Sequence, residues 1–436
     1  MTDTGITYLL WHDLVGLTRT RGIPSRNLKK VLADGVGWAC AGQALTPFQD
    51  IVENPWGPMD EVRQVPDPST LFTISGDDQT PAFNAVICDS KNVDGSEWDC
   101  CGRSFLKAAL ADLHRETGLG IYASFEHEFS ITGDGFNPSP PFSIEAARQQ
   151  NKFLTNLEQA LHDAGVSVST IEPEFGLGQY EVACTPEVGM AAADKCLVGR
   201  EVIREIARRR GLHASFTPKP AADAVGNGAH VHMSLINENG ENQTYDPEGL
   251  MNLSKVARQF SAGILAHLEA LVAITAPTPI SYYRLGPHHW SCGFRAIGLQ
   301  NREAALRVTP GIGDENKKRK GHNLEYRPCD GTASPYLVLG SLVRAGLEGI
   351  RTNNEALTEV TKDPAEMSEK ALQVAGVTPL PASLDIALAA LANDPVARTW
   401  FSPKMHDIYQ TLKLWEIDQA KNQPEDALFE RYRATY

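Results

Sequence analysis

No run of apolar residues in this 436-residue sequence reaches the roughly 18 to 20 positions that a membrane-spanning helix needs. The first residues carry Asp3 and no basic segment, so they lack the pattern of a secretory signal peptide. None of the eight cysteines forms a Cys-x-x-Cys pair, which argues against a zinc ribbon and a disulfide framework. We therefore expect a cytoplasmic protein with reduced thiols and no membrane partner.

Positive charge is also scarce. The sequence has 40 Lys and Arg residues against 54 Asp and Glu residues, a formal net charge of -14. This balance disfavours nucleic acid or an anionic membrane surface as the main partner. The sequence contains neither a Walker A motif nor a Gly-x-Gly-x-x-Gly motif, so it gives no support to a P-loop or Rossmann nucleotide site.

The hydrophobic patterns predict an α+β fold, because strands and helices mix without regular βαβ alternation. The length suggests two domains, and the pattern changes near Gly102, so we place an N-terminal domain at 1–102 and a second domain at 103–436. We expect strands at 7–11, 13–19 (after a turn), 83–88, 122–131, 213–218 and 229–235. We expect helices at 104–117 (with Ser104 as the cap), 144–164, 190–210, 253–275, 334–351 and 403–436.

Two carboxylates stand inside one apolar strand. Glu126 and Glu128 are two residues apart, and the period of a strand places their side chains on the same face. Two such charges repel each other, and burying them unpaired costs free energy. A bound dication would remove both problems. The alternative is a solvent-exposed face on which the pair has no function.

Further metal ligands follow along the chain. Glu174 and Glu181 are seven residues apart in a glycine-rich segment, and His230 and His232 alternate on one face of a predicted strand. Glu325 stands in another apolar segment. Five glutamates with an imidazole suit Mg²⁺ or Mn²⁺, because these hard cations prefer oxygen ligands. Zinc would favour more histidine or cysteine.

Four arginines lie between residues 284 and 327, threaded through apolar segments: Arg284, Arg302, Arg307 and Arg327. Arginine binds carboxylate and phosphate in a bidentate manner. Any one of them alone would be interpreted as a surface ion pair, but beside the glutamates they indicate phosphoryl transfer from ATP. The basic run at 317–320 is either a solvated loop or a contact to phosphate.

Several motifs, in order and spacing, resemble the glutamine synthetase superfamily over nearly the whole chain. The matching segments are FEHEF (125–129), EPEFGLGQYE (172–181), FTPKP (216–220), GNGAHVHMSL (226–235), APTPISYYRL (276–285), NREAALRV (301–308), LEYRPCDGTASPYL (324–337) and FERYRATY (429–436). The resemblance implies a small N-terminal β-grasp domain followed by a larger domain with a curved antiparallel sheet and helices. It also implies a homo-oligomeric ring, commonly a dodecamer of two hexameric rings, with active sites between neighbouring subunits.

The resemblance implies two metal sites. The metal near the amino-acid substrate would be held by Glu128, Glu174 and Glu181. The metal near the ATP phosphates would be held by Glu126, His230 and Glu325.

The resemblance implies substrate contacts as well. Arg284 would bind the α-carboxylate of glutamate beside the loop of Gly226. The nucleotide and phosphoryl contacts would be made by His232, Ser234, Arg302, Arg307 and Arg327, with Arg302, Arg327 and Glu325 acting in catalysis. In the implied mechanism ATP phosphorylates the γ-carboxylate of glutamate, and an amine nitrogen then displaces phosphate.

The sequence departs from ammonium-using members of the family at both acids that bind ammonium. The flap position six residues after Arg284 is Trp290, and the segment at 38–42 has no acid where the family has an aspartate. Ammonium needs negative charge, whereas tryptophan offers apolar surface and a cation–π face. We therefore predict a ligase that joins glutamate to an organic amine, with Trp290 and His289 in the amine site and His288 or His289 as the base.

Three rival interpretations stay open. An ordinary glutamine synthetase would need another acid, such as Asp50 or Asp60. A catalytically silent scaffold or sensor would not need the glutamate cluster, and a kinase acting on a guanidine would share the catalytic fold.

Asn323 also stands where the family has an arginine. This difference either weakens an ATP contact or is compensated by the basic run at 317–320.

Overall fold

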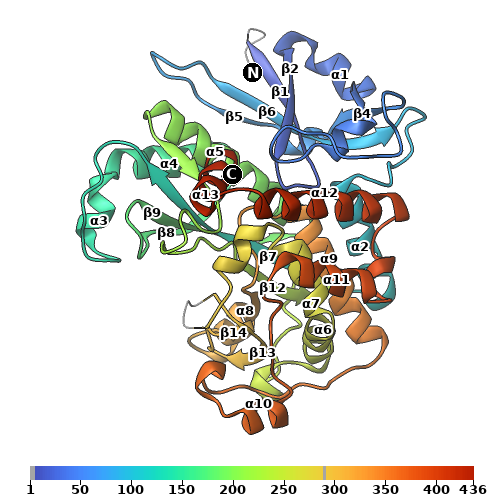
Figure 1. Ribbon diagram of the computed structural model, residues 1–436, viewed down its shortest axis with the longest axis vertical. Coiled ribbons are helices and arrows are strands. Elements are labelled where there is room, and N and C mark those ends of the chain that lie inside the picture. Colours follow the sequence, from blue (N-terminus) through green and yellow to red (C-terminus); the bar gives the residue numbers. More distant parts are fainter. Residues whose placement is uncertain (1–4, 288–290) are drawn as a thin grey trace.

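The N-terminal part of the chain forms its own sheet. In the computed structural model, which describes residues 5–287 and 291–436, this sheet has the strand order β2-β1-β6-β4-β3, with β5 beside β6 (Figure 1). Strand β1 pairs with β6 in parallel and with β2 in antiparallel fashion. The strands are β1 (Ile6–His12), β2 (Thr18–Pro24), β3 (Val36–Ala39), β4 (Glu61–Pro66), β5 (Phe72–Ile74) and β6 (Phe83–Asn92).

The second sheet runs through the larger part of the molecule, and β7 lies near its centre. Its strand order is β16-β13-β14-β15-β12-β7-β9-β8, and β10 and β11 also pair with β7. The pairing is antiparallel except between β13 and β14. The strands are β7 (Gly120–Thr132), β8 (Val168–Pro173), β9 (Gln179–Cys184), β10 (Glu187–Val188), β11 (His213–Ser215), β12 (Val231–Ile236), β13 (Phe294–Leu299), β14 (Ala304–Thr309), β15 (Asn323–Tyr326) and β16 (Thr378–Pro379).

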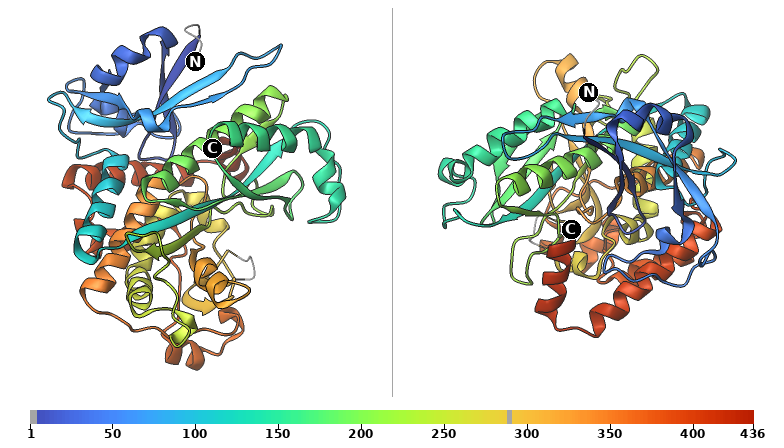
Figure 2. Two further views of the ribbon diagram at one scale, coloured as in Figure 1. Left: turned by 180° about the vertical axis from the view of Figure 1, so that it is seen from behind. Right: turned by 90° about the horizontal axis from the view of Figure 1, so that it is seen from above.

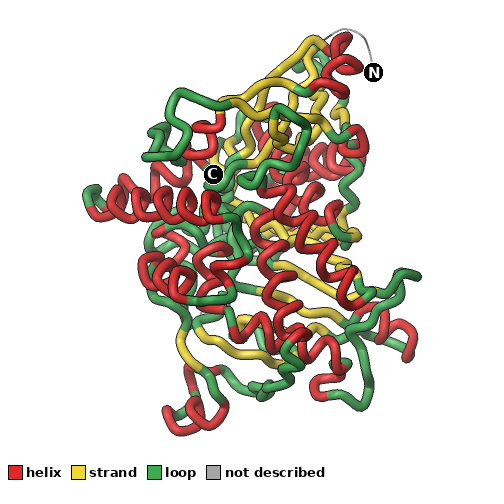
Figure 3. The backbone as a smooth tube through the Cα atoms, turned by 90° about the vertical axis from the view of Figure 1, so that its right-hand side faces the viewer, coloured by secondary structure: helices red, strands yellow, loops and turns green. Residues whose placement is uncertain are grey.

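Helices pack against this larger sheet and separate it from the N-terminal sheet (Figures 2 and 3). Helix α12 runs below the N-terminal sheet in Figure 1, where it contacts the short helix η2 (Cys40–Ala44). The α-helices are α1 (Leu28–Asp34), α2 (Gly102–Thr117), α3 (Ile144–Gln149), α4 (Asn151–Asp163), α5 (Met190–Arg209), α6 (Lys255–Ala266), α7 (Leu268–Thr275), α8 (Glu315–Gly321), α9 (Pro335–Arg351), α10 (Glu369–Ala375), α11 (Leu384–Asn393), α12 (Pro403–Lys421) and α13 (Glu425–Thr435). The other 3₁₀ turns are η1 (Ser25–Asn27), η3 (Pro68–Thr70), η4 (Leu250–Asn252), η5 (Pro279–Tyr283), η6 (Pro364–Glu366) and η7 (Ala397–Thr399).

The predicted α+β fold is confirmed, and the long strand at 122–131 is present as β7. Three of the predicted helices are divided. The segment at 144–164 breaks at Gln150, that at 253–275 breaks at His267, and the C-terminal segment breaks before Pro424, which cannot continue a helix. The predicted cap was wrong, since α2 begins at Gly102 and the hydroxyl of Ser104 donates to Glu97 instead. The division into domains at residue 102 stays a prediction.

A buried arginine joins the N-terminal sheet to the larger part of the molecule. Arg103 in α2 is 4% exposed. It donates hydrogen bonds to Asp89 on β6, to Asp67 beside that strand, and to Asp194 on α5. Asp194 also accepts from the hydroxyl of Tyr336 on α9. One cation thus neutralises carboxylates from both sides of the junction.

Helices α6 and α9 approach each other closely enough to require glycine. A Cβ atom on Gly263 would lie 2.1 Å from the carbonyl oxygen of Ala345, and one on Gly349 would lie 2.0 Å from that of Gln259. Helix α9 also packs against α2, α5 and α7. Among the described residues, no helix combines the length and the hydropathy needed to cross a membrane.

Candidate active site

Strand register sets a row of carboxylates across β7, β8 and β9. Glu128 on β7 lies opposite Glu181 on β9, and Glu181 lies opposite Glu172 on β8. Residues paired in this way have neighbouring side chains on one face of the sheet. The alternation in sequence therefore becomes a concentration of negative charge in space.

A second row crosses β12, β15 and β14. His232 lies opposite Glu325, and Glu325 lies opposite Arg307. The two rows meet because the backbone N–H of Glu126 donates to the carbonyl of His230, at 3.0 Å, just before β12 begins. The centre of the larger sheet thus carries acids, imidazoles and guanidinium groups side by side.

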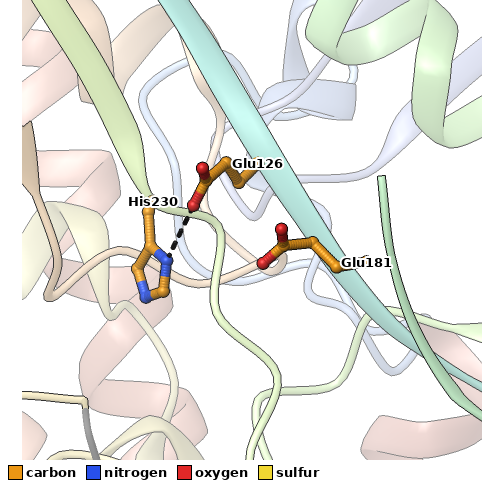
Figure 4. Close-up of side chains that lie close together, drawn as sticks. All are labelled: Glu126, Glu181 and His230. Carbon is orange, nitrogen blue, oxygen red and sulfur yellow. Dashed lines mark hydrogen bonds and ion pairs between the residues drawn. The ribbon is translucent and has the colours of Figure 1, made fainter. Parts of the chain in front are cut away.

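The side chains converge as the sequence predicts, although they do not sort into two separate triads. Figure 4 shows Glu126, Glu181 and His230 directed toward one another, with Nδ1 of His230 at 3.3 Å from a carboxylate oxygen of Glu126. The same nitrogen lies 3.7 Å from oxygens of Glu128 and Glu325. The groups whose ligand atoms lie within 4.8 Å of one another are Glu126–Glu181–His230, Glu126–His232–Glu325 and Glu172–Glu174–Glu181. The assignment of ligands to two metals stays a prediction.

Crowding perturbs the acids. Burial, followed by the charge of Glu128, raises the pKa of Glu174 to about 7. Burial and the nearby Glu126 raise the pKa of Glu181 as well. Burial alone would also raise the pKa of Glu126, but the adjacent His232 and His230 hold that pKa well below its ordinary value. The cluster therefore retains protons that a dication would displace.

His232 is fixed on both sides. Its Nδ1 lies 2.8 Å from the side-chain oxygen of Asn323, and its Nε2 lies 3.0 Å from a carboxylate oxygen of Glu126. Burial opposes ionisation, but the Glu126 carboxylate prevails and raises the pKa of His232 to about 9. Asn323, which stands where the family has an arginine, thus orients this imidazole.

Three of the predicted arginines surround Glu325 and His230. Arg307 donates to Glu325 at 2.7 Å, and Arg327 donates to the other oxygen of that carboxylate. Arg284 is buried, and its Nη2 lies 3.3 Å from Nε2 of His230. Burial would raise the pKa of Glu325, but Arg327 holds it below its ordinary value.

Arg302 lies at the edge of this group. Its side chain is exposed, and its backbone carbonyl accepts a hydrogen bond of 3.0 Å from Nε of Arg327. The structure thus connects Arg302 to the site through Arg327. Its predicted contact with phosphate stays a prediction.

The glycine loop packs tightly against Arg284. A Cβ atom on Gly226 would lie 2.8 Å from the Cγ of Arg284, and one on Gly228 would lie 2.6 Å from its Nη2. The N–H of Gly228 donates to Glu128 at 2.7 Å. Larger residues at either position would displace the arginine, so the need for glycine is steric.

Sequence reasoning missed the polar groups that hold this loop. The side chain of Gln179 on β9 donates to the carbonyl of Gly226 at 2.8 Å and to the side chain of Asn227 at 2.9 Å. Asn227 donates in turn to Ser130 and to the carbonyl of Thr217. One feature of the sequence could have indicated Gln179: it is two residues before Glu181 and therefore lies on the same face of the strand. Glu172 was missed as a neighbour of Glu174 and Glu181.

Ser234 lies where β12 meets the end of the basic helix α8. Its hydroxyl donates to the carbonyl of His322 at 3.2 Å. The helix itself is exposed, and the guanidinium of Arg319 lies 5.4 Å from the centre of the Tyr245 ring. The predicted amine-site residues His289 and Trp290, and the candidate base His288, lie outside the described residues.

The donor set fits a hard dication. It consists of carboxylates and imidazole without thiolate, and burial together with the neighbouring carboxylates raises the pKa of Glu174 and of Glu181. Mg²⁺ and Mn²⁺ prefer such oxygen-rich sites. The same crowding makes metal binding depend on pH, because ligands must lose their protons to bind.

We expect the affinity for Mg²⁺ or Mn²⁺ to rise at least about tenfold between about pH 6 and pH 8, because Glu174, with a pKa of about 7, loses its proton over that range and the raised pKa of Glu181 adds to the effect. The stability of the metal-free protein should fall over the same pH range. Because the pKa of Glu174 is raised in the folded protein, this group contributes stability that is fully present below its unfolded pKa of 4.5 and is lost as the pH rises through about 7. Calorimetric titration with the metal and a pH series of Tm measure the two effects. Equal affinity at both pH values, or an unchanged pH dependence in the Glu174→Gln variant, would contradict this account.

Comparisons with known proteins agree with the geometry. Residues 99–432 match the family described as glutamine synthetase, catalytic domain, and residues 4–98 match the glutamine synthetase N-terminal domain. A γ-glutamylpolyamine synthetase of Streptomyces coelicolor is 32% identical over 100% of this chain and 95% of its own length. A glutamine synthetase of Methanocaldococcus jannaschii is 30% identical over 95% of this chain and 92% of its own. A crystal structure described as a novel glutamine synthase homolog aligns with a TM-score of 0.91 and 37% identity, over 100% of this chain and 99% of that one.

Proposed function

Because the chain belongs to the glutamine synthetase family and is an ATP-dependent ligase that forms carbon–nitrogen bonds, we propose that its acceptor is an organic amine and its product a γ-glutamyl amide. The observation that carries this proposal is the segment at 38–42, where family members that use ammonium place an acid. Cys40 is buried there, and the ring of Trp38 lies 5.2 Å from that of Trp11. The segment thus offers aromatic surface in place of a carboxylate. The Streptomyces relative is named a γ-glutamylpolyamine synthetase, which agrees with an organic amine as the acceptor.

Glutamate is proposed to bind at Arg284, beside the loop of Gly226. The buried guanidinium would hold the α-carboxylate, as its position against the loop allows. The γ-carboxylate would then point toward the acids of β7 and β9. This arrangement explains why the loop is held by the network of Gln179 and Asn227.

The proposed reaction has two steps. The γ-carboxylate of glutamate attacks the terminal phosphorus of ATP, which gives γ-glutamyl phosphate and ADP. The deprotonated amine nitrogen then attacks the activated carbon, so that a C–N bond forms, the C–O bond to phosphate breaks and the nitrogen releases a proton to the base. Arg302, Arg307 and Arg327 are proposed to balance the charge of the phosphates during the first step.

Two dications are proposed to bind at this site. Glu128, Glu174 and Glu181 would hold one, and Glu126, His230 and Glu325 the other. Bound dications would supply neutralisation of the phosphoryl charge. The base that accepts the amine proton is predicted from the sequence to be His288 or His289.

Ammonium is the second candidate acceptor, because a carboxylate lies beside the same segment. Asp60 is exposed, and its backbone carbonyl accepts from the N–H of Cys40 at 3.3 Å. If ammonium were the substrate, Asp60→Asn should raise its KM at least about tenfold, because a bound cation would lose its counter-charge. Our proposal predicts no more than about a twofold change, as for the matched control Asp50→Asn, since exposed charges contribute little.

The test of the proposal is phosphate release with ATP, Mg²⁺ and glutamate across ammonium, alkylamines, arylamines and polyamines. Turnover with an organic amine and almost none with ammonium would support it. Efficient use of ammonium would make the chain a glutamine synthetase. Absence of turnover with every acceptor would favour the scaffold or sensor, and transfer to a guanidine compound would favour a kinase.

A ring-shaped homo-oligomer is part of the same proposal. The family resemblance implies active sites completed by a neighbouring subunit. Light scattering on the purified protein should give a mass several times that of one chain, which is 47.5 kDa. A monomer that is fully active would contradict this part of the proposal.

A further inference from the structure

A small cavity lies directly beside the acidic row. It has a volume of about 220 Å³ and lies between the loop at 136–141 and the turn at 174–179, at the left of Figure 1 where α3 approaches β8. Glu174, whose carboxylate belongs to the group with Glu172 and Glu181, forms part of its wall. The cavity therefore shares Glu174 with the acidic group beside which the γ-carboxylate is proposed to react.

The rest of the cavity wall is mainly apolar. Phe136, Pro141, Phe175 and Leu177 line it, together with other proline, glycine and uncharged polar residues. Among the described residues that line the cavity, Glu174 is the only one that carries a charge. A ligand that fills this space would meet one carboxylate, that of Glu174, which accepts a hydrogen bond of 3.3 Å from the N–H of Phe175, and otherwise an uncharged wall.

Two side chains of this wall are unusually exposed for their type. Phe175 is 61% exposed and Leu177 is 60% exposed. They stand on a turn that is held by hydrogen bonds from the N–H of Gly176 to the Gln179 side chain and from the N–H of Gln179 to the Gly176 carbonyl. Gly178 has a φ of +69°, and a Cβ atom there would lie 2.4 Å from the carbonyl oxygen of Ile131. The apolar wall is thus fixed before any ligand binds, which lowers the entropy lost on binding.

We propose that this cavity receives the organic substituent of the acceptor amine, and that it selects monoamines with an uncharged alkyl or aryl group over polyamines. The inference rests on the proposed function and names its substrate class. A polyamine would place a second ammonium group against this wall, whose one carboxylate among the described residues, that of Glu174, would be committed to the proposed metal. Removing such a charge from water without a partner is costly, whereas a methyl group at the same place gains from leaving water.

The test compares n-butylamine with 1,4-diaminobutane, which have the same four-carbon chain and differ by the terminal ammonium group. We expect kcat/KM to be at least about tenfold higher for n-butylamine, because an unpaired ammonium opposes binding in an apolar site. In Phe175→Ala and Leu177→Ala, the ratio of kcat/KM for n-butylamine to kcat/KM for ammonium should fall about tenfold. Val374→Ala, which truncates an apolar side chain that is 80% exposed on α10, is the matched control and should leave this ratio unchanged.

A gain-of-function variant keeps the test independent of lost activity. Leu177→Glu adds a second carboxylate to the cavity wall and should shift the preference toward 1,4-diaminobutane by at least about tenfold, because it supplies a counter-charge that is not a proposed metal ligand. If kcat/KM of the parent protein for 1,4-diaminobutane equals or exceeds that for n-butylamine, the inference is overturned while the proposed function stays intact. Exclusive use of ammonium would overturn both. An equal loss with every acceptor, or a change of oligomeric state in Phe175→Ala, would assign the apolar wall to folding or to subunit contacts and would overturn the inference.

Discussion

Replacement of Glu325 by glutamine is expected to lower kcat/KM for ATP-dependent amide formation by about a thousandfold, the scale seen when one preorganised charged group is removed from an active site. Glu325 is 1% exposed and accepts hydrogen bonds from Arg307 and Arg327, and it lies 3.7 Å from His230. The amide has nearly the same shape but carries no charge. It would leave two guanidinium groups without their common anion and would weaken one proposed metal site.

The control for this variant is Glu355→Gln. Glu355 also neighbours two cations, Arg258 at 2.9 Å and Lys255 at 3.7 Å, but it lies near the start of α6. Loss of this exposed pair should change kcat/KM by less than about twofold. Steady-state kinetics should be measured alongside Tm, so that lost folding is separated from lost chemistry. A folded Glu325→Gln protein within about tenfold of the parent would contradict a central role for this carboxylate.

Replacement of Arg103 by methionine is expected to lower the free energy of unfolding by about 3 to 5 kcal/mol, the usual result when one partner of a buried ion pair is removed. Asp194 would then lose its cation while buried, Asp89 would keep only its ion pair with Lys107, and the N-terminal sheet would lose its link to α5 and α9. Methionine keeps most of the side-chain volume, so the change measures charge more than packing.

Urea denaturation of Arg103→Met gives this difference directly. The matched control is Arg115→Met on the same helix, because Arg115 also pairs with two carboxylates, Asp112 and Glu116, but its side chain is 64% exposed. The control should change the free energy of unfolding much less, because exposed ion pairs contribute little to stability. Equal effects of the two substitutions would show that burial at the junction does not amplify the contribution of the ion pairs.

The alternation of apolar and polar residues and the order of the motifs predicted the parts of the structure that depend on local periodicity. The strand that carries Glu126 and Glu128 is present as β7, and both carboxylates lie within 3.7 Å of Nδ1 of His230. The breaks at Gln150 and His267 were not predicted, because neither position has the glycine or proline that marks a helix end. At His267 a tertiary contact, Nδ1 to Asp394 at 2.6 Å, accompanies the break.

The sequence indicated which residues gather at the site better than it indicated how they are arranged in space. Sequence spacing cannot state which strands pair, so it could not show that Glu172 lies opposite Glu181 or that Arg307 lies opposite Glu325. The role of Asn323 in holding His232 likewise depends on a contact across strands. The apolar cavity beside Glu174 needs the loop at 136–141 to meet the turn at 174–179, which no local pattern indicates.

The choice of acceptor is the central claim, and a direct competition tests it. The protein would be supplied with ATP, Mg²⁺, glutamate and equal concentrations of ammonium and n-butylamine, and the products would be identified by mass spectrometry. Our account predicts γ-glutamylbutylamide as the main product, with glutamine about a hundredfold lower or less, because the ammonium site lacks its acids. Glutamine as the main product would contradict the account.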